Sequence, residues 1–345
     1  MKPSVSQPPY FSNLERFGRQ LEENSRLPLL VTGIAGVAGF NAFSYFRQKY
    51  GPSVYGQRPV NNWPLSGPGI IGVNLEDTQA VAQFIQSKNI QSVLNCGGSC
   101  ALKNCELDPA MAHRANVVAI QSLLDALSKS EIRLLHVSID LVFSGTGAGG
   151  HDEFALTDPV TVYGKTMVQA EQLIVQRRPQ SAILRISLPM GSSFSGHAGA
   201  IDWIQSRFVQ GKPATLYYDE VRSPTYVECL NEVFEEMIAG HVDGLFHAGG
   251  PRNVSLYEIA QIVNAVGGYD PDLLQGCYRL EAGPLPPRAG NVTMNSGKLV
   301  KLLGRAPFKE WPIDPKLRPM SRNWHYQRGE FLSSPDQIQN QLYQR

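Results

Sequence analysis

The sequence predicts an α/β fold in which a doubly wound parallel sheet is followed by a smaller, mixed α/β C-terminal lobe. Three observations lead to this prediction. Short apolar runs alternate with helical segments between residues 27 and 190, which is typical of parallel strands covered by helices on both faces. The first run breaks into regularly spaced glycines before a helix begins. After Gly191 the glycine, proline and aromatic content changes, and helical and strand patterns are mixed.

The first apolar run leads into Thr32-Gly-Ile-Ala-Gly-Val-Ala-Gly39, where three glycines are spaced three apart. Gly33 can adopt the backbone angles of a tight turn, and Gly36 leaves room for a pyrophosphate beside backbone N–H groups. Gly39 allows close packing of helix on strand, and the helix N-terminus favours anions. This pattern predicts a Rossmann-type turn whose cofactor-binding residues are Gly33, Ile34, Ala35, Gly36, Val37, Ala38 and Gly39.

The remaining elements are predicted from the period of their apolar residues. Strands are expected at 53–58, 69–75, 92–96 and 133–138, and helices at 79–87 and 110–128. In the C-terminal lobe, helices are expected at 200–210 and 257–266, and short strands at 215–218 and 244–248.

The chain divides into four parts. Residues 1–26 form a polar N-terminal extension, in which an amphipathic helix is predicted from Phe11, Leu14, Phe17 and Leu21. Residues 27–190 form the dinucleotide-binding domain, and residues 191–310 form mainly the substrate-binding lobe, interleaved with that domain. Residues 311–345 are polar and are expected to wrap the surface, with an oligomer contact as the alternative.

Charge and cysteine content exclude several classes of function. With 31 Lys and Arg against 30 Asp and Glu, the net charge of +1 provides no field that would recruit nucleic acid or an anionic membrane. No apolar run has the length of a membrane span, and residues 1–26 are too polar for a signal peptide, so a soluble cytoplasmic protein is expected. Cys96, Cys100 and Cys105 lie close together but lack paired metal-ligand spacing, so no metal site is expected.

The end of the second predicted strand bears on the choice of cofactor. Folds that prefer NAD usually place Asp or Glu there to hold the ribose 2′-OH, whereas Arg suits the 2′-phosphate of NADP. The chain has Gln57 and Arg58, so NADP is favoured, with NAD as the alternative. Arg58 is expected near the 2′-phosphate, and Asn74 and Leu75 near the adenine.

Further motifs follow the glycine-rich turn in order. They are Asn95-Cys-Gly-Gly98, Ser138-Ile-Asp-Leu-Val-Phe143, Pro159-Val-Thr-Val-Tyr-Gly-Lys-Thr166 with Glu171, Ser223-Pro-Thr-Tyr226 and Arg288-Ala-Gly-Asn291. From Leu30 to Gly304 the chain resembles the extended short-chain dehydrogenase/reductases, and among them the dTDP-4-dehydrorhamnose reductase family. It also resembles the regulatory beta subunit of methionine adenosyltransferase.

The resemblance implies hydride transfer from NADPH to the C4 keto group of a nucleotide-linked sugar or a related small molecule, with Tyr163 as general acid. It implies further cofactor contacts at Cys96, Gly97, Gly98, Asn116 and Tyr163. The implied substrate residues are Cys100, Asp140, Arg185, Arg222, Arg288 and Asn291. A structural ion pair is the alternative for Arg288, and a surface position is the alternative for Arg222.

Two catalytic positions depart from the family pattern. The family has a hydroxyl where this chain has Ile139, and a lysine where it has Met167, four residues after Tyr163. Lys165 lies two residues after Tyr163 and should point away on a helix, and Ser138 should face the opposite side of the sheet from Ile139. Either could substitute only through local backbone irregularity.

Two hypotheses about function follow from these departures. The first is a nucleotide-sugar reductase with an altered or weakened site. The second is a cofactor-binding protein without reductase turnover, acting as a regulator or subunit. The expected assembly is a homodimer or a complex with a partner enzyme. Binding of a dinucleotide is expected in both cases, so only turnover of a 4-keto nucleotide sugar distinguishes them.

Overall fold

A computed structural model describes residues 21, 25–196, 198–327 and 333–343. Apart from Leu21, which is buried against the main core, the predicted N-terminal amphipathic helix lies outside the described residues. Within the described part of the chain, no helix is both long and apolar enough to cross a membrane.

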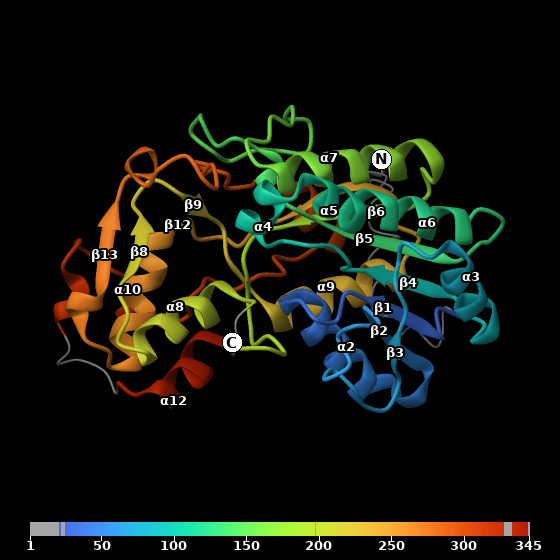
Figure 1. Cartoon of the computed structure of the whole chain (residues 1–345), viewed down its shortest axis with the longest axis horizontal. Helices are drawn as coiled ribbons and strands as arrows, with labels where there is room; N and C mark the ends of the chain where they lie inside the picture. Colours follow the sequence, from blue (N-terminus) through green and yellow to red (C-terminus); the bar gives the residue numbers. More distant parts are fainter. Residues whose placement is uncertain (1–20, 22–24, 197, 328–332, 344–345) are drawn as a thin grey trace, which may run out of the picture.

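A seven-stranded parallel sheet forms the centre of the larger domain (Figure 1). Its strands are β1 (Leu29–Thr32), β2 (Val54–Arg58), β3 (Ile70–Gly72), β4 (Ser92–Asn95), β5 (Arg133–Ile139), β6 (Ala182–Ile186) and β11 (Gly244–Ala248). They are arranged in the order β11-β6-β5-β4-β1-β2-β3, and each neighbouring pair is parallel. The predicted doubly wound α/β sheet is confirmed.

Helices cover both faces of this sheet. The helices α2 (Val37–Tyr50) and α9 (Val227–Ala239) pack on one face, where their apolar side chains join the larger core cluster. The helices α3 (Thr78–Ser87), α6 (Ala119–Ala126) and α7 (Val162–Arg177) share a second core on the other face. Because both faces are buried, the strands are apolar along their whole length, as the sequence shows.

The smaller lobe is built around α10 (Leu256–Gly267) and a two-stranded sheet of β8 (Ala214–Tyr217) and β13 (Leu274–Cys277), with α8 (Ala200–Val209) beside them. Short strands connect this lobe to the larger domain: β7 (Pro189–Met190), β9 (Val221–Arg222), β10 (Thr225–Tyr226) and β12 (Val254–Ser255). The helix α11 (Gly297–Leu303) then returns to β11. Figure 1 shows the two parts side by side.

One predicted lobe strand belongs to the other domain. Residues 244–248 do form a strand, β11, but it pairs with β6 at the edge of the main sheet rather than within the C-terminal lobe. The preceding helix, α9, packs on the same sheet. A five-residue apolar run predicts a strand but does not determine its partner, because strand pairing is a long-range contact.

The helix predicted at 110–128 is interrupted by a wider turn. It consists of α5 (Pro109–His113), a π-helical turn over Arg114–Val118 and then α6, and it is preceded by an additional short helix, α4 (Leu102–Leu107). The wider turn contains Asn116, whose Oδ1 accepts a hydrogen bond from the Ser99 N–H (2.7 Å). Such π-helical turns often occur where a helix presents a side chain to a functional loop.

The C-terminal segment is more deeply packed than its polar composition predicted. Trp311 is fully buried, and its Nε1–H donates to the carbonyl oxygen of Leu342 (2.8 Å). Leu317, Trp324 and Ile338 also join the main core cluster. The last helix, α12 (Pro335–Ile338), packs against α10. The described part of this segment therefore helps to complete the core of the lobe.

Candidate cofactor and substrate cavity

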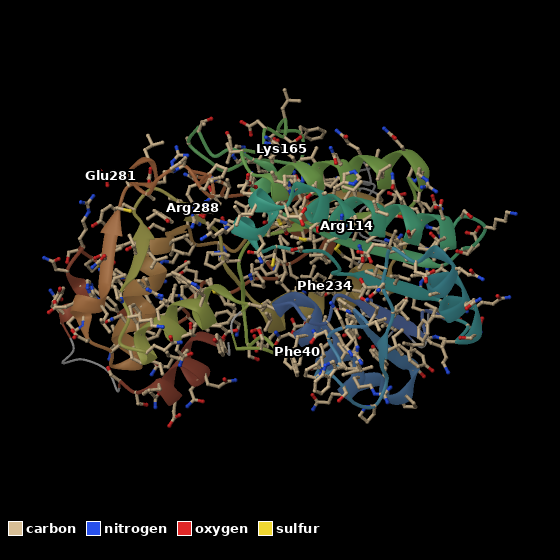
Figure 2. All side chains as sticks on the ribbon, viewed as in Figure 1. Phe40, Arg114, Lys165, Phe234, Glu281 and Arg288 are labelled. Atoms are coloured by element: carbon tan, nitrogen blue, oxygen red, sulfur yellow. The ribbon has the colours of Figure 1, made fainter. Side chains whose placement is uncertain are left out.

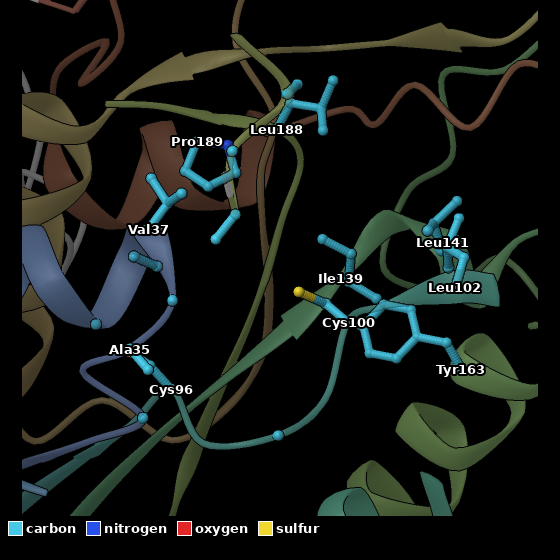
Figure 3. A pocket seen from close by; sticks show the side chains of 18 of the residues that line it. Ala35, Val37, Cys96, Cys100, Leu102, Ile139, Leu141, Tyr163, Leu188 and Pro189 are labelled. Atoms are coloured by element: carbon cyan, nitrogen blue, oxygen red, sulfur yellow. The ribbon is translucent and has the colours of Figure 1, made fainter. Parts of the chain in front are cut away.

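A cavity of about 1150 Å³ lies between the carboxyl ends of the main sheet strands and the smaller lobe. The larger domain contributes the glycine-rich turn, the loop after β4 and the end of β5. The lobe contributes α8, β8 and β9. Figure 3 shows Ala35 and Val37 on one side of the cavity and Tyr163 on the other. This is the position at which open α/β sheets bind ligands.

The glycine-rich turn has the geometry that a dinucleotide pyrophosphate requires. Gly33 has a φ of +67°, and a Cβ there would lie 2.3 Å from the carbonyl oxygen of Cys96. A Cβ on Gly39 would lie 2.4 Å from the carbonyl oxygen of Gly33, so the helix approaches the turn too closely for any side chain. At Gly36, by contrast, the nearest atom to a Cβ would be 3.7 Å away, which is an ordinary van der Waals contact and no clash.

The first turn of α2 is free to bind an anion. Its N-cap, Gly36, provides no capping side chain, and the first turn contains no acidic residue. The N–H groups at a helix start have no partner within the helix, and together with the helix dipole they favour phosphate. The turn therefore fits the pyrophosphate of a dinucleotide. Ile34 alone among the predicted turn residues does not line the cavity, because its side chain is buried in the core.

A buried chain of hydrogen bonds supports the cavity floor. The Thr32 hydroxyl donates to Asn95 Oδ1 (2.5 Å), and Asn95 Nδ2 donates to Nδ1 of His136 (2.8 Å). The N–H of Gly97 donates back to the Thr32 hydroxyl (3.2 Å), which fixes the loop that includes Gly98. His136 Nε2 has no hydrogen-bond partner among the described residues, and burial lowers the pKa of His136 to about 4.

This histidine predicts a specific acid sensitivity. His136 stays neutral in the folded protein, whereas an unfolded histidine has a pKa of about 6.5. The contribution of His136 to the free energy of unfolding should therefore be fully present above pH 6.5 and should be lost as the pH falls towards 4. This difference in pKa between the folded and unfolded states corresponds to about 3 kcal/mol in the free energy of unfolding. Urea unfolding measured from pH 8 to 4.5 should show a smaller loss in His136→Gln than in the wild type. The exposed His113→Gln is the control, and an equal loss in all three proteins would contradict this assignment.

The predicted cofactor residues at the end of β2 are arranged differently from expectation. Arg58 does not line the cavity, because its guanidinium donates to the carbonyl oxygens of Leu65, Pro59 and Val60. Gln57 lines it instead, and its Oε1 accepts a hydrogen bond from the Gly33 N–H (3.0 Å). A charged side chain after a strand is drawn to nearby carbonyl groups, and the sequence does not reveal those groups.

The other predicted cofactor residues fall into two groups. Asn74, Leu75, Cys96, Gly97 and Gly98 line the cavity. Asn116 does not line it, but its Nδ2 donates to the Thr166 hydroxyl (2.9 Å), so it fixes the loop at Ser99 from behind.

Tyr163 lies in the cavity in a mainly apolar environment. It packs in one cluster with Met167 and Leu141, and Ile139 packs against that cluster. Figure 3 shows its ring beside Ile139 and Cys100. Its hydroxyl makes no hydrogen bond within the described part of the chain, and burial raises the pKa of Tyr163 well above its usual value. Asp140 raises that pKa further, and Arg222 lowers it.

Neither proposed substitute group reaches the Tyr163 hydroxyl. Ser138 lines the cavity, but its hydroxyl donates to Glu171 Oε1 (2.5 Å), inside a buried ion pair, and faces away from Ile139 as strand geometry predicts. Lys165 is exposed on the outer side of α7 (Figure 2). Both β5 and α7 are regular at these positions, so the local irregularity that either substitution would need does not occur.

The predicted substrate residues are only partly brought together. Cys100, Arg222 and Arg288 line the cavity. Asp140 is fully buried behind it, where it pairs with the guanidinium of Arg222 through Nε to Oδ2 (2.7 Å) and Nη2 to Oδ1. Asp140 therefore positions Arg222 and neutralises its charge.

Arg185 and Asn291 do not line the cavity. Arg185 forms a buried two-point ion pair with Glu171, through Nε to Oε1 (2.8 Å) and Nη2 to Oε2 (2.6 Å). Asn291 Nδ2 donates to the carbonyl oxygen of Ala148 (2.7 Å) and so holds the segment around residue 291, which bridges to Val221 of β9, to the 145–150 segment. Their polar groups are satisfied by the protein itself.

Several lining residues from the lobe escaped the sequence prediction. They are Trp203 and Arg207 on α8, Thr215 and Tyr217 on β8, and Glu220. Two patterns in the sequence involve these residues. Trp203 and Arg207 are four apart, which places them on one face of a helix, and Glu220 and Arg222 are two apart, which places them on one side of a strand. Neither pattern indicated a cavity until the lobe was placed against the sheet.

Among the described residues, the structure brings together no group of three or more His, Cys, Asp or Glu side chains that could hold a metal ion. All five described cysteines are free thiols. Burial raises the pKa of Cys96 to about 12 and also raises the pKa of Cys100 and Cys105. The thiolate form that reacts or binds metal is thereby disfavoured.

Comparison with known proteins identifies the family. The family model described as the RmlD substrate binding domain matches residues 28–313. The chain belongs to this RmlD family. The predicted resemblance to dTDP-4-dehydrorhamnose reductases is therefore confirmed.

Curated relatives of this RmlD-family chain include both enzymes and a subunit. The chain is 26% identical over 246 residues to dTDP-4-dehydrorhamnose reductase of Mycolicibacterium smegmatis, covering 69% of this chain and 72% of the relative. It is also 26% identical over 296 residues to methionine adenosyltransferase 2 subunit beta of Xenopus laevis, covering 81% and 84%. These similar identities do not favour either relative.

Solved structures share the fold of this RmlD-family chain. The dTDP-4-dehydrorhamnose reductase of Bacillus anthracis in complex with NADP superposes with a TM-score of 0.68 at 18% identity, covering 82% of this chain and 95% of the other. MoeE5 in complex with UDP-glucuronic acid and NAD gives a TM-score of 0.69 at 20% identity, covering 91% and 99%.

Proposed function

We propose that this protein binds NADP(H) and a nucleotide-linked sugar in the cavity but has weak or no reductase turnover. The observation that carries the proposal is the surroundings of Tyr163. The residues packed around its phenol include Ile139 and Met167, and the positions that supply a hydroxyl and an ammonium in the family thus supply only carbon and sulfur atoms. A phenol without a neighbouring unpaired cation keeps a high pKa and donates its proton poorly.

The cofactor assignment is supported by the glycine-rich turn. The open position at Gly36 and the uncapped start of α2 match the requirements of a pyrophosphate. Bound there, NADPH would supply the hydride, and Gly97 and Gly98 would lie along its path across the sheet ends. The similar Bacillus anthracis structure contains NADP, and β2 ends in Gln57 and Arg58 rather than in an acidic residue that would favour NAD.

An active 4-keto nucleotide-sugar reductase is the alternative. Two observations favour it: Tyr163 is retained in the cavity, and the guanidinium of Arg222 acts on it electrostatically. However, Asp140 pairs with Arg222 and acts on Tyr163 in the opposite direction, so the pair leaves little net positive charge beside the phenol.

The test combines binding with turnover. We expect calorimetry to detect NADPH binding to the full chain, and we expect NADPH oxidation with dTDP-4-dehydrorhamnose to remain below the ordinary enzyme range of roughly 1–10³ s⁻¹. Turnover within that range would establish the reductase alternative. Failure to bind NADPH would contradict both the proposed function and the reductase alternative.

A further inference from the structure

The carboxylate of Glu220 is the most unusual polar group on the lobe side of the cavity. Glu220 is only 2% exposed, yet it lines the cavity. Neither of its carboxylate oxygens accepts a hydrogen bond from a described residue, and Oε2 is fully buried. A buried carboxylate without hydrogen-bond donors is costly, and native proteins rarely leave one without a functional reason.

The nearest cation, Arg288, forms the ion pair that was the alternative expected for it, but it donates no hydrogen bond to this carboxylate. Arg288 Nη1 lies 3.7 Å from Glu220 Oε2, which is too long for a hydrogen bond. The Arg288 guanidinium is instead held over the ring of Tyr217, 4.7 Å from its centroid. The second guanidinium, of Arg222, donates to Asp140 through Nε and Nη2 rather than to Glu220. Burial accordingly raises the pKa of Glu220.

Glu220 lies at the Tyr163 end of the cavity. Glu220 and Arg222 are two residues apart in an extended segment, so their side chains project from the same face. Arg222 is fixed to Asp140, which directly follows Ile139 at the end of β5. If the proposed function holds, the glycosyl group would lie at this end, and the pyrophosphate of the cofactor would lie at the start of α2.

We propose that Glu220 accepts a hydrogen bond from the glycosyl part of the ligand and thereby selects sugars that present a hydroxyl or an ammonium group there. This inference rests on the proposed function and adds the chemistry that the sugar must provide. The diphosphate of the ligand is not the partner of Glu220, because both are anionic. Arg288 remains available beside Glu220 to donate to a neighbouring sugar oxygen.

The experiment compares nucleotide sugars with their nucleoside diphosphates. Calorimetry on the NADP⁺-loaded full chain would use dTDP and dTDP-glucose, and UDP and UDP-glucose. We expect Glu220→Ala to weaken binding of the glucose-bearing ligands about 10- to 100-fold, the range for a hydrogen bond to a charged group. We expect binding of dTDP or UDP alone to change less than about threefold, because neither carries the group that Glu220 contacts.

Two further variants separate recognition from folding. Glu220→Gln keeps the shape of the side chain and one acceptor oxygen, so it should retain part of the affinity. The neighbouring Asp219→Asn is the matched control, because Asp219 pairs with Arg279 and does not line the cavity. It should bind all four ligands like the wild type.

One additional ligand distinguishes a sugar hydroxyl from a sugar ammonium as the group that donates to Glu220. Tighter binding of dTDP-4-amino-4,6-dideoxyglucose than of dTDP-glucose, lost in Glu220→Gln, would identify an ammonium, and the reverse order would identify a hydroxyl. Glucose-bearing ligands that bind Glu220→Ala and the wild type equally would overturn this inference and leave the proposed function intact. If none of the nucleotide sugars binds the wild type, the proposed function and this inference both fail.

Discussion

The Ile139→Thr/Met167→Lys double variant is expected to oxidise NADPH with dTDP-4-dehydrorhamnose about 10²- to 10⁴-fold faster than the wild type, the range that general acid catalysis supplies. Met167 lies one helical turn after Tyr163 and lines the same cavity, so a lysine there would place an ammonium beside the phenol. Its charge would lower the pKa of Tyr163, which burial now raises. A threonine at 139 would add a hydrogen bond to the substrate carbonyl.

A matched double variant controls for changes in packing. Ile139→Val/Met167→Leu alters the same two buried positions without adding polar groups, and it should remain as slow as the wild type. A silent Ile139→Thr/Met167→Lys variant that still binds NADPH would show that the sugar pocket has also diverged. That result would favour the regulator or subunit hypothesis over a weakened reductase.

The second large effect is expected at the glycine-rich turn. Gly36→Asp should weaken NADP(H) binding by at least about 10²-fold, because a carboxylate would repel the pyrophosphate at short range. The φ of Gly36 is −86° and its Cβ position is open, so the substitution introduces no clash. Aspartate is also a favourable N-cap, since it accepts hydrogen bonds from the first turn of α2. Thermal stability should therefore be maintained or increased while cofactor affinity is lost.

Calorimetry with NADPH and a thermal unfolding curve would measure both effects in one sample. Gly147→Asp is the matched control, because Gly147 is exposed, has nothing within 4 Å of its Cβ position and lies outside the cavity lining. Unchanged NADPH affinity in Gly36→Asp would contradict the assignment of the pyrophosphate to this turn. Comparable loss in Gly147→Asp would indicate a general charge effect.

Local features of the sequence determined the cofactor turn and the broken catalytic pattern. The positive φ of Gly33 and the close approach at Gly39 follow from residues a few positions apart. The same is true of Met167 on the Tyr163 face of α7 and of Ser138 facing away from Ile139, because helix and strand periods are local properties. The parallel sheet also followed from local alternation of apolar runs with helices.

The tertiary structure alone decided which distant groups meet. It placed β11 in the main sheet, turned Arg58 towards loop carbonyl groups and packed Trp311 into the core. It also paired Arg222 with Asp140 and, within the part of the chain that is described, left the Glu220 carboxylate without a hydrogen-bond donor. Strand pairing, burial and the satisfaction of buried charges depend on residues far apart in the chain. The sequence gives the chemistry of each side chain. Which partner a buried polar side chain contacts depends on the free energy of removing it from water and on the contacts it gains, and both are set only when the chain has folded.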